Sequence, residues 1–290
     1  MQDHTFSVLL THYGDSYWVI KAIGSANLLN LESIKDVFVI DNNHGDSELN
    51  AWASQQHKVK ILEYPPSGSG NAHHANALNS FLAEELIKTS HLIIMDSDLI
   101  VQSSNWIDNI LEILDVAESC LALDPVSDYL THPCFMVIPI EAASSLDFME
   151  GMVSLKIDTG RTIGLQLSKL GFSTHLLKPE PGYGGKLGFS YLDGKLFHVT
   201  SISIRQQPTR RLGKSSFRIS LAESWRRWIL DSRLEKRSHF SYGLIFLFLR
   251  IFYAVKFGFL YLIRMIIFSG SARNLFQNPK DDQGFHNKEA

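Results

Sequence analysis

Short apolar runs alternate with amphipathic stretches through the first 200 residues of the 290-residue chain. Continuous apolar runs predict buried β-strands, and apolar residues spaced three or four apart predict helices packed on them. The predicted strands cover residues 6–11, 37–40, 59–64, 91–95, 121–123 and 134–139. The predicted helices cover residues 15–30, 47–56, 71–88, 106–118 and 159–170. This alternation indicates an α/β fold, with a doubly wound, mostly parallel sheet between two helical layers.

A hairpin is predicted at the end of this region. Residues 191–197 contain the turn-forming pair Asp193-Gly194 between two short apolar segments. An Asp-Gly pair favours a two-residue hairpin turn, because both positions tolerate a positive φ. The hairpin places His198 at the end of its return strand.

The pattern changes after residue 200. Residues 205–237 are rich in Arg, and residues 242–268 are almost entirely apolar. The apolar run is long enough to cross a bilayer as a helix, but it contains three basic residues, Arg250, Lys256 and Arg264. At helical periodicity they fall within an arc of about 120°. One basic stripe on an apolar helix is typical of a helix that lies in the membrane interface. A core-packing or oligomerising helix is the alternative.

We therefore expect four segments. Residues 1–204 form the α/β domain and residues 205–238 a basic connector rich in Arg and Trp. Residues 239–270 form an apolar, membrane-associating helix, and residues 271–290 a polar, disordered tail.

Charge is distributed unevenly along the chain. Residues 1–200 contain 11 Lys and Arg against 24 Asp and Glu, whereas residues 201–273 contain 14 against 3. A basic block on an acidic body predicts an anionic partner. Because the block continues into the apolar segment, we expect its partner to be an anionic membrane surface. No nucleic-acid partner is expected. Nucleic-acid binding is the alternative, because the stretch is rich in Arg and Trp. We expect a peripheral or monotopic protein on the cytoplasmic face of the inner membrane.

Composition excludes two classes of protein. With 45% hydrophobic and 20% charged residues, the chain is not of the disordered, low-complexity kind. Its two cysteines, Cys120 and Cys134, form no CxxC pair, which excludes a zinc ribbon or a disulfide framework and favours a reducing compartment.

Short polar segments follow the first four predicted strands. They are Thr11-His12-Tyr13, Asp41-Asn42-Asn43, residues 67–71, and Asp96-Ser97-Asp98. Ligands of open α/β sheets bind beyond the carboxyl ends of the strands. The four segments together therefore predict one polar crevice.

Asp96 and Asp98 are the sharpest candidates within it. Two carboxylates directly after an apolar strand suit a hard divalent cation, which in turn neutralises a nucleotide diphosphate. His198 is the expected third ligand, since imidazole suits Mn²⁺ and similar ions. Asp158 is the candidate base for an acceptor hydroxyl, although a carboxylate before a helix is also a common N-cap.

These residues, in this order, resemble a GT-A glycosyltransferase and are most similar to the inverting, nucleotide-sugar-dependent enzymes of family 2. The resemblance covers about residues 5–200 and is carried by FSVLLTHY, VFVIDNN, GSGNAHHANALN, LIIMDSD, HPCFMVIP and DTGRTIGLQLSKLGF.

The resemblance implies a role for each segment. Thr11, His12 and Tyr13 would line the nucleotide pocket, and Asp41 would bind a uracil-type base, with Asn43 and Ser69 beside them. Asn71 and Asn76 would shape the donor site. Asp96 would approach the ribose or the metal, which would be Mn²⁺ or Mg²⁺, and Asp98 would ligate the metal. HPCFMVIP would be the strand beneath the acceptor.

The sequence departs from the family pattern in three places. Asp158 has no Glu before it, His132-Pro133-Cys134 stands where many members have Gly-Gly, and the QxxRW-type helix of processive synthases is not evident. We therefore expect transfer of a single sugar from a nucleotide-sugar donor, in the first place a UDP-sugar, to a glycan or lipid-linked acceptor of the cell envelope. A nucleotidyltransferase of similar fold and a non-catalytic membrane scaffold are the alternatives, although Thr11–Asp15 is poor in the Gly, Arg and Lys that hold a triphosphate.

Overall fold

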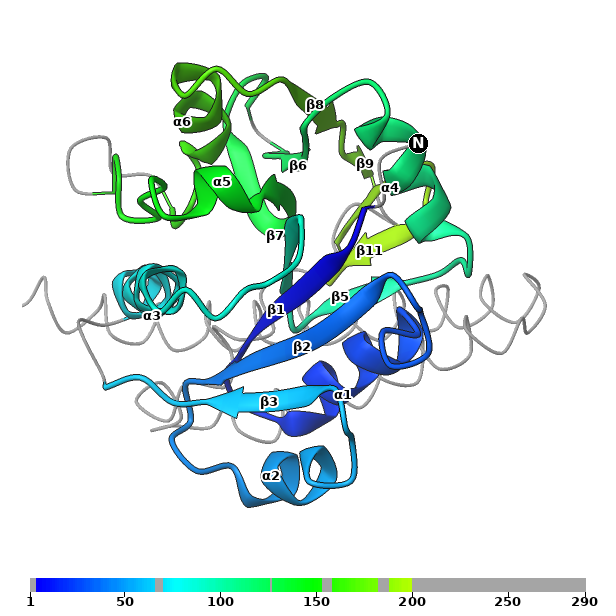
Figure 1. The fold of residues 1–290 in the computed structure, drawn as a ribbon, viewed down its shortest axis with the longest axis vertical. Coiled ribbons are helices and arrows are strands. Elements are labelled where there is room, and N and C mark those ends of the chain that lie inside the picture. Colours follow the sequence, from blue (N-terminus) through cyan, green and yellow to red (C-terminus); the bar gives the residue numbers. More distant parts are fainter. Residues whose placement is uncertain (1–3, 66–69, 126, 153–157, 182–187, 200–290) are drawn as a thin grey trace, which may run out of the picture. The chain divides into compact units, whose positions relative to one another are not determined.

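The computed structural model describes residues 4–65, 70–125, 127–152, 158–181 and 188–199 (Figure 1). The chain divides into two units, Met1–Ser224 and Trp225–Ala290, and every described residue belongs to the first. Ser69 and the predicted segments 205–238, 239–270 and 271–290 therefore lie outside the described residues. Within the described ranges, no helix combines the length and hydropathy needed to cross a membrane.

A seven-stranded sheet forms the centre of the fold. Its strands lie in the order β3-β2-β1-β4-β7-β6-β8. Neighbouring strands are parallel except at β7, which runs antiparallel to both β4 and β6. Their bounds are β1 Phe6–His12, β2 Ile34–Asp41, β3 Val59–Leu62, β4 His91–Asp96, β6 Ser119–Leu123, β7 Thr131–Pro139 and β8 Thr174–Leu177. The predicted mostly parallel, Rossmann-like α/β architecture is confirmed.

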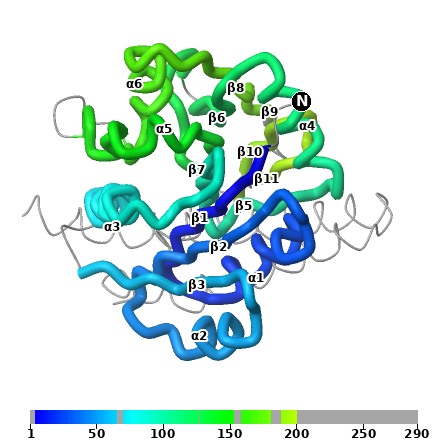
Figure 2. Tube along the Cα trace, viewed as in Figure 1, coloured from blue at the N-terminus to red at the C-terminus, as the bar shows by residue number. Residues whose placement is uncertain are grey.

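Helices cover both faces of this sheet (Figure 2). Side chains of α1, α2 and α4 pack on one face and those of α3, α5 and α6 on the other, because successive residues of each strand point to opposite faces. The helices are α1 Ser16–Ser25, α2 Ser47–Ala53, α3 Asn71–Ala83, α4 Trp106–Leu114, α5 Ile140–Ala143 and α6 Ile163–Lys169.

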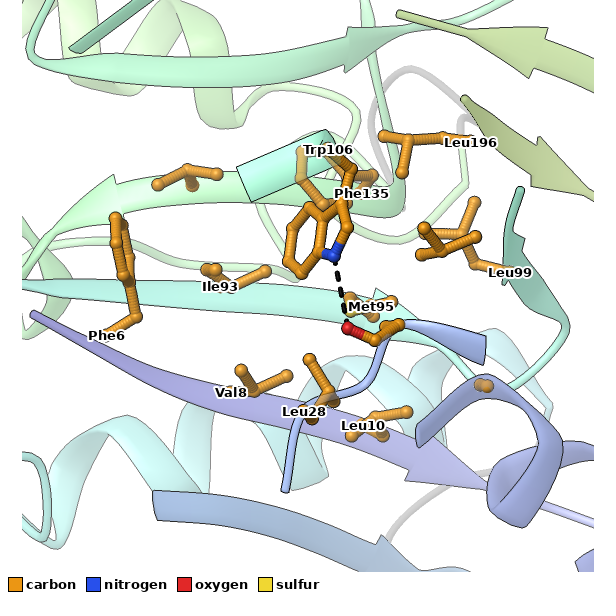
Figure 3. Close-up of a cluster of buried hydrophobic side chains, with 14 of the residues drawn as sticks. Phe6, Val8, Leu10, Leu28, Ile93, Met95, Leu99, Trp106, Phe135 and Leu196 are labelled. Carbon is orange, nitrogen blue, oxygen red and sulfur yellow. Dashed lines mark hydrogen bonds between the residues drawn. The ribbon is translucent and has the colours of Figure 1, made fainter. Parts of the chain in front are cut away.

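Trp106 lies in the core on the face of the sheet that α1, α2 and α4 cover. It is 1% exposed, and its indole N–H donates to the Ala26 carbonyl oxygen at 3.1 Å (Figure 3). Phe135 packs edge-on against it, with ring centroids 6.2 Å apart. A buried indole needs such a partner, because an unpaired N–H in an apolar core is costly. The contact joins α4, the end of α1 and β7.

A second, four-stranded sheet lies beside the first, in the order β5-β11-β10-β9. Its strands are β5 Leu99–Val101, β9 Glu180–Pro181, β10 Phe189–Tyr191 and β11 Leu196–His198. The hairpin of β10 and β11 turns through Asp193 and Gly194, which have φ values of 52° and 78°. The predicted hairpin is therefore present, with His198 as the last residue of β11.

Several helices are shorter than their patterns predict. Helix α1 ends before Asn27 and α3 before Glu85, and these two residues have φ values of 54° and 52°. A residue in the left-handed conformation ends a helix. Glycine is the usual sequence signal for such an end, and Asn27 and Glu85 do not provide it. The predicted helix 159–170 begins only at Ile163, after a turn at Gly160 with φ 66°. Asp158 is therefore not the N-cap of α6, which is Thr162.

Candidate active site

The carboxyl ends of β2, β1 and β4 lie side by side. His12 is paired with Asp41 across β1 and β2, and Thr11 is paired with Asp96 across β1 and β4. This register brings three of the four predicted polar segments to one edge of the sheet. The fourth, 67–71, is described only from Gly70 onwards.

Asp96, Asp98 and His198 meet at this edge. The Nε2 atom of His198 lies 3.1 Å from Oδ1 of Asp98 and 3.5 Å from Oδ2 of Asp96. The second sheet fixes this arrangement, because the Val199 N–H donates to the Asp98 carbonyl oxygen at 3.0 Å. The side chains of Asp98 and His198 are 11% and 7% exposed, and that of Asp96 is 20% exposed. The cluster is thus nearly buried but still reached by solvent at Asp96.

The cluster has an excess of negative charge. Burial and the neighbouring Asp98 carboxylate raise the pKa of Asp96 well above its usual value, and Asp158 acts in the same direction. Burial alone would lower the pKa of His198, but Asp98 and Asp96 raise it overall. Two carboxylates this close disfavour each other's ionised form, and His198 offsets that repulsion only in part.

These three residues fit a divalent cation. Their ligand atoms all lie within 4.8 Å of one another. Two carboxylates and one imidazole form a donor set that suits Mn²⁺ or Mg²⁺. A bound cation would also relieve the repulsion that raises the pKa of Asp96.

Asp158 lies on a loop that is fixed on several sides. Its Oδ1 accepts a hydrogen bond from the Thr159 N–H at 2.7 Å, and the Thr159 hydroxyl donates to the Asn71 carbonyl oxygen at 2.9 Å. Thr131 of β7 donates its hydroxyl to the Gly160 carbonyl oxygen at 2.9 Å. The loop is thereby tied to the start of α3 and to β7. Because the Asp158 carboxylate contributes to the raised pKa of Asp96, it acts electrostatically on the cluster of Asp96, Asp98 and His198.

The same loop is held by an ion pair that is buried at its acidic end. Arg161 lies 2.9 Å from the Asp124 carboxylate, which is 1% exposed on its side chain. The pair links the loop of Asp158 to the end of β6.

Asp41 and His12 hold the loop after β2. Both are fully buried. The Asp41 carboxylate accepts hydrogen bonds from three backbone N–H groups, those of Asn43, Gly45 and Asp46. His12 Nε2 lies 3.1 Å from the Asp46 carboxylate. The two side chains therefore shape this loop from within, and their predicted contacts with a nucleotide stay predictions.

Asn43 joins two loops of the same edge. Its side chain accepts from the Gly14 N–H and donates to the Gly14 carbonyl oxygen, both at 2.8 Å. Thr11 is buried and Tyr13 is half-buried. Their roles in nucleotide binding also stay predictions.

Helix α3 points its first turn toward the Asp158 loop. Asn71 is exposed and Asn76 is half-buried. His74 is a residue that the sequence reasoning missed. Burial lowers its pKa to about 4, against the opposing effect of Asp158, and within the described chain its Nε2 has no hydrogen-bond partner. A histidine in the first turn of a helix carries no sequence signal that separates it from an ordinary surface residue.

Sequence reasoning also missed His132 and Cys134 as site residues, and both lie beside His198 of the cluster. The His132 and His198 rings lie 5.0 Å apart, and burial together with His198 lowers the pKa of His132 to about 3. Both residues come from the beginning of β7. They reach this edge because β7 is antiparallel to β4, so its amino end lies beside the carboxyl end of β4.

No protein-family model matches the sequence, and no curated protein is significantly similar to it. Among solved structures, 4-diphosphocytidyl-2C-methyl-D-erythritol synthase from Anaerococcus prevotii is 6% identical, with a TM-score of 0.43 over 62% of this chain and 90% of that one. A mannosyltransferase from Pyrobaculum calidifontis, solved in complex with GDP-Man and Mn²⁺, is 13% identical, with a TM-score of 0.43 over 95% of this chain and 88% of that one. The glycosyltransferase GlyE of Streptococcus pneumoniae is 12% identical, with a TM-score of 0.44 over 79% of this chain and 64% of that one. Likenesses this distant carry no conclusion about function.

Proposed function

We propose that the chain is a GT-A glycosyltransferase, related to the inverting enzymes of family 2. It transfers one sugar from a nucleotide-diphosphate sugar, in the first place a UDP-sugar, to a hydroxyl of a cell-envelope glycan or a lipid-linked acceptor. The observation that carries the proposal is the meeting of Asp96, Asp98 and His198 at the carboxyl edge of the sheet, with Asp158 acting on the same cluster.

The acid pair, Asp96 and Asp98, holds the donor's cation together with His198. A divalent cation bound there supplies the positive charge that stabilises the diphosphate as it leaves. The start of α3 supports the same assignment. Gly70 is the N-cap of this 13-residue helix and provides no side-chain cap, so first-turn N–H groups remain to bind an anion.

Asp158 is the base in this proposal. It takes the proton from the acceptor hydroxyl, whose oxygen attacks the anomeric carbon from the face opposite the nucleotide, and a single displacement of this kind inverts the anomeric configuration. The ties of its loop to α3 and β7 support the role, because a catalytic carboxylate must be held in place before the acceptor arrives.

The basic and apolar C-terminal segments provide the membrane contact in this proposal. Basic residues near an anionic leaflet contribute about 1 kcal/mol each to binding, and the apolar segment 239–270 adds hydrophobic insertion. A lipid-linked acceptor would then be met at the surface where it resides.

A panel of nucleotide sugars tests the function. Metal-dependent release of a nucleoside diphosphate from one of them supports glycosyl transfer. Release of pyrophosphate from a nucleoside triphosphate and a phosphorylated alcohol would instead identify a nucleotidyltransferase, whose donor also needs a divalent cation. A chain that binds no nucleoside diphosphate in the presence of Mn²⁺ would be a non-catalytic scaffold.

A further inference from the structure

A second group of metal-binding side chains adjoins the acid pair. One ligand atom each of His132, Cys134 and His198 lie within 4.8 Å of one another. Cys134 is fully buried as a free thiol and His198 is 6% exposed. His132 comes from the first residues of β7 and His198 from the end of β11, so two different sheets hold the group in place.

The donor atoms of this group differ in kind from those of the acid pair. Two imidazole nitrogens and one thiolate sulfur suit Zn²⁺, whereas carboxylate oxygens suit Mg²⁺ and Mn²⁺. Zinc sites with three protein ligands commonly leave a fourth position for water or a further ligand. The three side chains can therefore hold Zn²⁺ without a protein ligand from outside the described residues.

Metal binding here displaces one proton and one hydrogen bond. The Cys134 thiol releases its proton to solvent on becoming a thiolate ligand. His132 Nδ1 now accepts a hydrogen bond from the Cys134 N–H at 3.1 Å. The ring gives up that bond whichever nitrogen ligates, because ligation through Nδ1 uses the accepting lone pair and ligation through Nε2 places the proton on Nδ1. A neutral backbone hydrogen bond is much weaker than coordination to zinc, so this rearrangement does not exclude the site.

His198 belongs to both groups, and this sharing has a direct consequence. A neutral imidazole offers a single lone pair, whichever of its nitrogens carries the proton. His198 can therefore ligate a metal in one group or in the other, but not in both at once.

We propose that His132, Cys134 and His198 form a Zn²⁺ site that competes with the acid pair for His198. Zinc bound there removes the imidazole from the site of the activating cation and lowers the affinity of that site for Mn²⁺. That zinc would thereby inhibit sugar transfer rests on the proposed function, whereas the existence of the zinc site does not.

Binding of Co²⁺ to the full-length chain tests the site directly, because cobalt bound to a thiolate has a charge-transfer absorption that carboxylate ligands do not give. The wild-type chain is expected to show this band and to lose it when Zn²⁺ is added. Cys134→Ser should abolish the band. Cys120→Ser, which changes the other buried cysteine, is the matched control and should keep it. Absence of the band in the wild type, or its persistence in C134S, would overturn the proposal.

Two further variants keep the test decisive if C134S does not fold, as judged by circular dichroism. His132→Gln alters a second ligand without touching the buried thiol and should weaken Co²⁺ binding at least about tenfold. Asp98→Asn changes the acid pair alone and should keep the cobalt–thiolate band. Unchanged Co²⁺ affinity in H132Q, or loss of the band in D98N, would contradict the assignment of ligands.

Competition is measured with Mn²⁺, whose free form is detected by electron paramagnetic resonance. Zinc should release bound Mn²⁺ from the wild-type chain, and C134S, or H132Q in its place, should need at least about ten times more Zn²⁺ for the same release. Equal zinc potency in wild type and variant would mean that Zn²⁺ simply replaces Mn²⁺ at the acid pair, and the competing site would be refuted. If the cobalt band behaves as expected while no nucleotide sugar is turned over, the zinc site stands and the proposed function fails.

Discussion

The Nε2 atom of His198 lies 3.1 Å from Oδ1 of Asp98, although the two residues are far apart in the sequence. The contact depends on strand pairing, because β11 pairs antiparallel with β5, and His198 is thereby placed opposite Leu99, the residue after Asp98. The second sheet thus completes a site that the large sheet begins. Changes to the β10–β11 hairpin should consequently affect the cluster of Asp96, Asp98 and His198 as well as stability.

Asp158→Asn tests the base. The substitution keeps size and polarity but removes proton acceptance, so transfer should fall by a factor of about 10² to 10⁴. Donor binding should be retained, because the side chains of Asp96, Asp98 and His198 are unchanged. Transfer and nucleoside diphosphate binding are measured on the same preparation.

Asp128→Asn, which changes an exposed carboxylate of the β6–β7 loop, is the control and should retain both transfer and nucleoside diphosphate binding. Transfer at the wild-type rate in D158N would mean that another group accepts the proton.

The residues Gly160 and Gly171 provide a matched pair for testing the loop of Asp158. Both have positive φ, 66° and 91°, but a Cβ on Gly160 would lie 2.9 Å from Phe148 Cδ1, whereas a Cβ on Gly171 would meet nothing within 4 Å. Gly171→Ala should cost about 1 kcal/mol of stability, from backbone strain alone. Gly160→Ala should cost more and should also reduce transfer, because the loop must move. Thermal unfolding measures the loss of stability in each variant, and equal losses would contradict the close packing of Gly160 against Phe148.

Asp46 links His12 to helix α2 and predicts a pH dependence. Burial raises the pKa of Asp46, but hydrogen bonds from the N–H groups of Leu49 and Glu48 and the interaction with the His12 ring outweigh this effect. The pKa of Asp46 therefore lies below its usual value of 3.8. A carboxyl with a lowered pKa stabilises the fold above its unfolded pKa, and this contribution is lost as the pH falls through the folded pKa.

Asp46→Asn should therefore be about 1 kcal/mol less stable than wild type at pH 7. The difference should shrink as the pH falls below the usual value of 3.8 and through the lowered pKa of the folded carboxyl. Urea unfolding at several pH values measures it, and a difference that stays constant down to pH 3 would show that Asp46 contributes no charge-dependent stability.

Removal of residues 238–290 tests the membrane contact. The truncated chain should lose flotation with vesicles that contain anionic lipid, while the full-length chain floats with them and less so with neutral vesicles. Nucleotide binding serves as the control that the truncated α/β domain is folded. Flotation that survives the truncation would place the membrane contact elsewhere in the chain.

Much of the large sheet could be predicted from hydrophobic periodicity alone. Strands β1 and β4, and β2 from Val37 onwards, are buried on both faces, so each is a largely continuous apolar run. Their alternation with helices indicates their parallel order. Strands β5 and β9 have only three and two residues, Leu99–Val101 and Glu180–Pro181. Elements this short give no periodic signal and form because distant segments supply their partners.

The site could be predicted in part, for a related reason. Asp96 and Asp98 follow a recognisable strand, and an Asp-Gly turn places His198 at the end of the next hairpin. His132 and Cys134 come from the amino end of β7, which reaches the same edge only because that strand runs in the opposite direction. Strand direction depends on tertiary packing, so reasoning from the carboxyl ends of parallel strands could not find them.

The binding of a nucleoside diphosphate, with and without Mn²⁺, tests the central claim most directly. In the wild-type chain and in the exposed-site control Asp108→Asn, Mn²⁺ should increase the affinity for UDP or GDP at least about tenfold. In Asp98→Asn this increase should disappear while the fold is retained. An affinity that does not respond to Mn²⁺ in the wild type, or that responds equally in D98N, would contradict the assignment of the acid pair as the diphosphate's metal site.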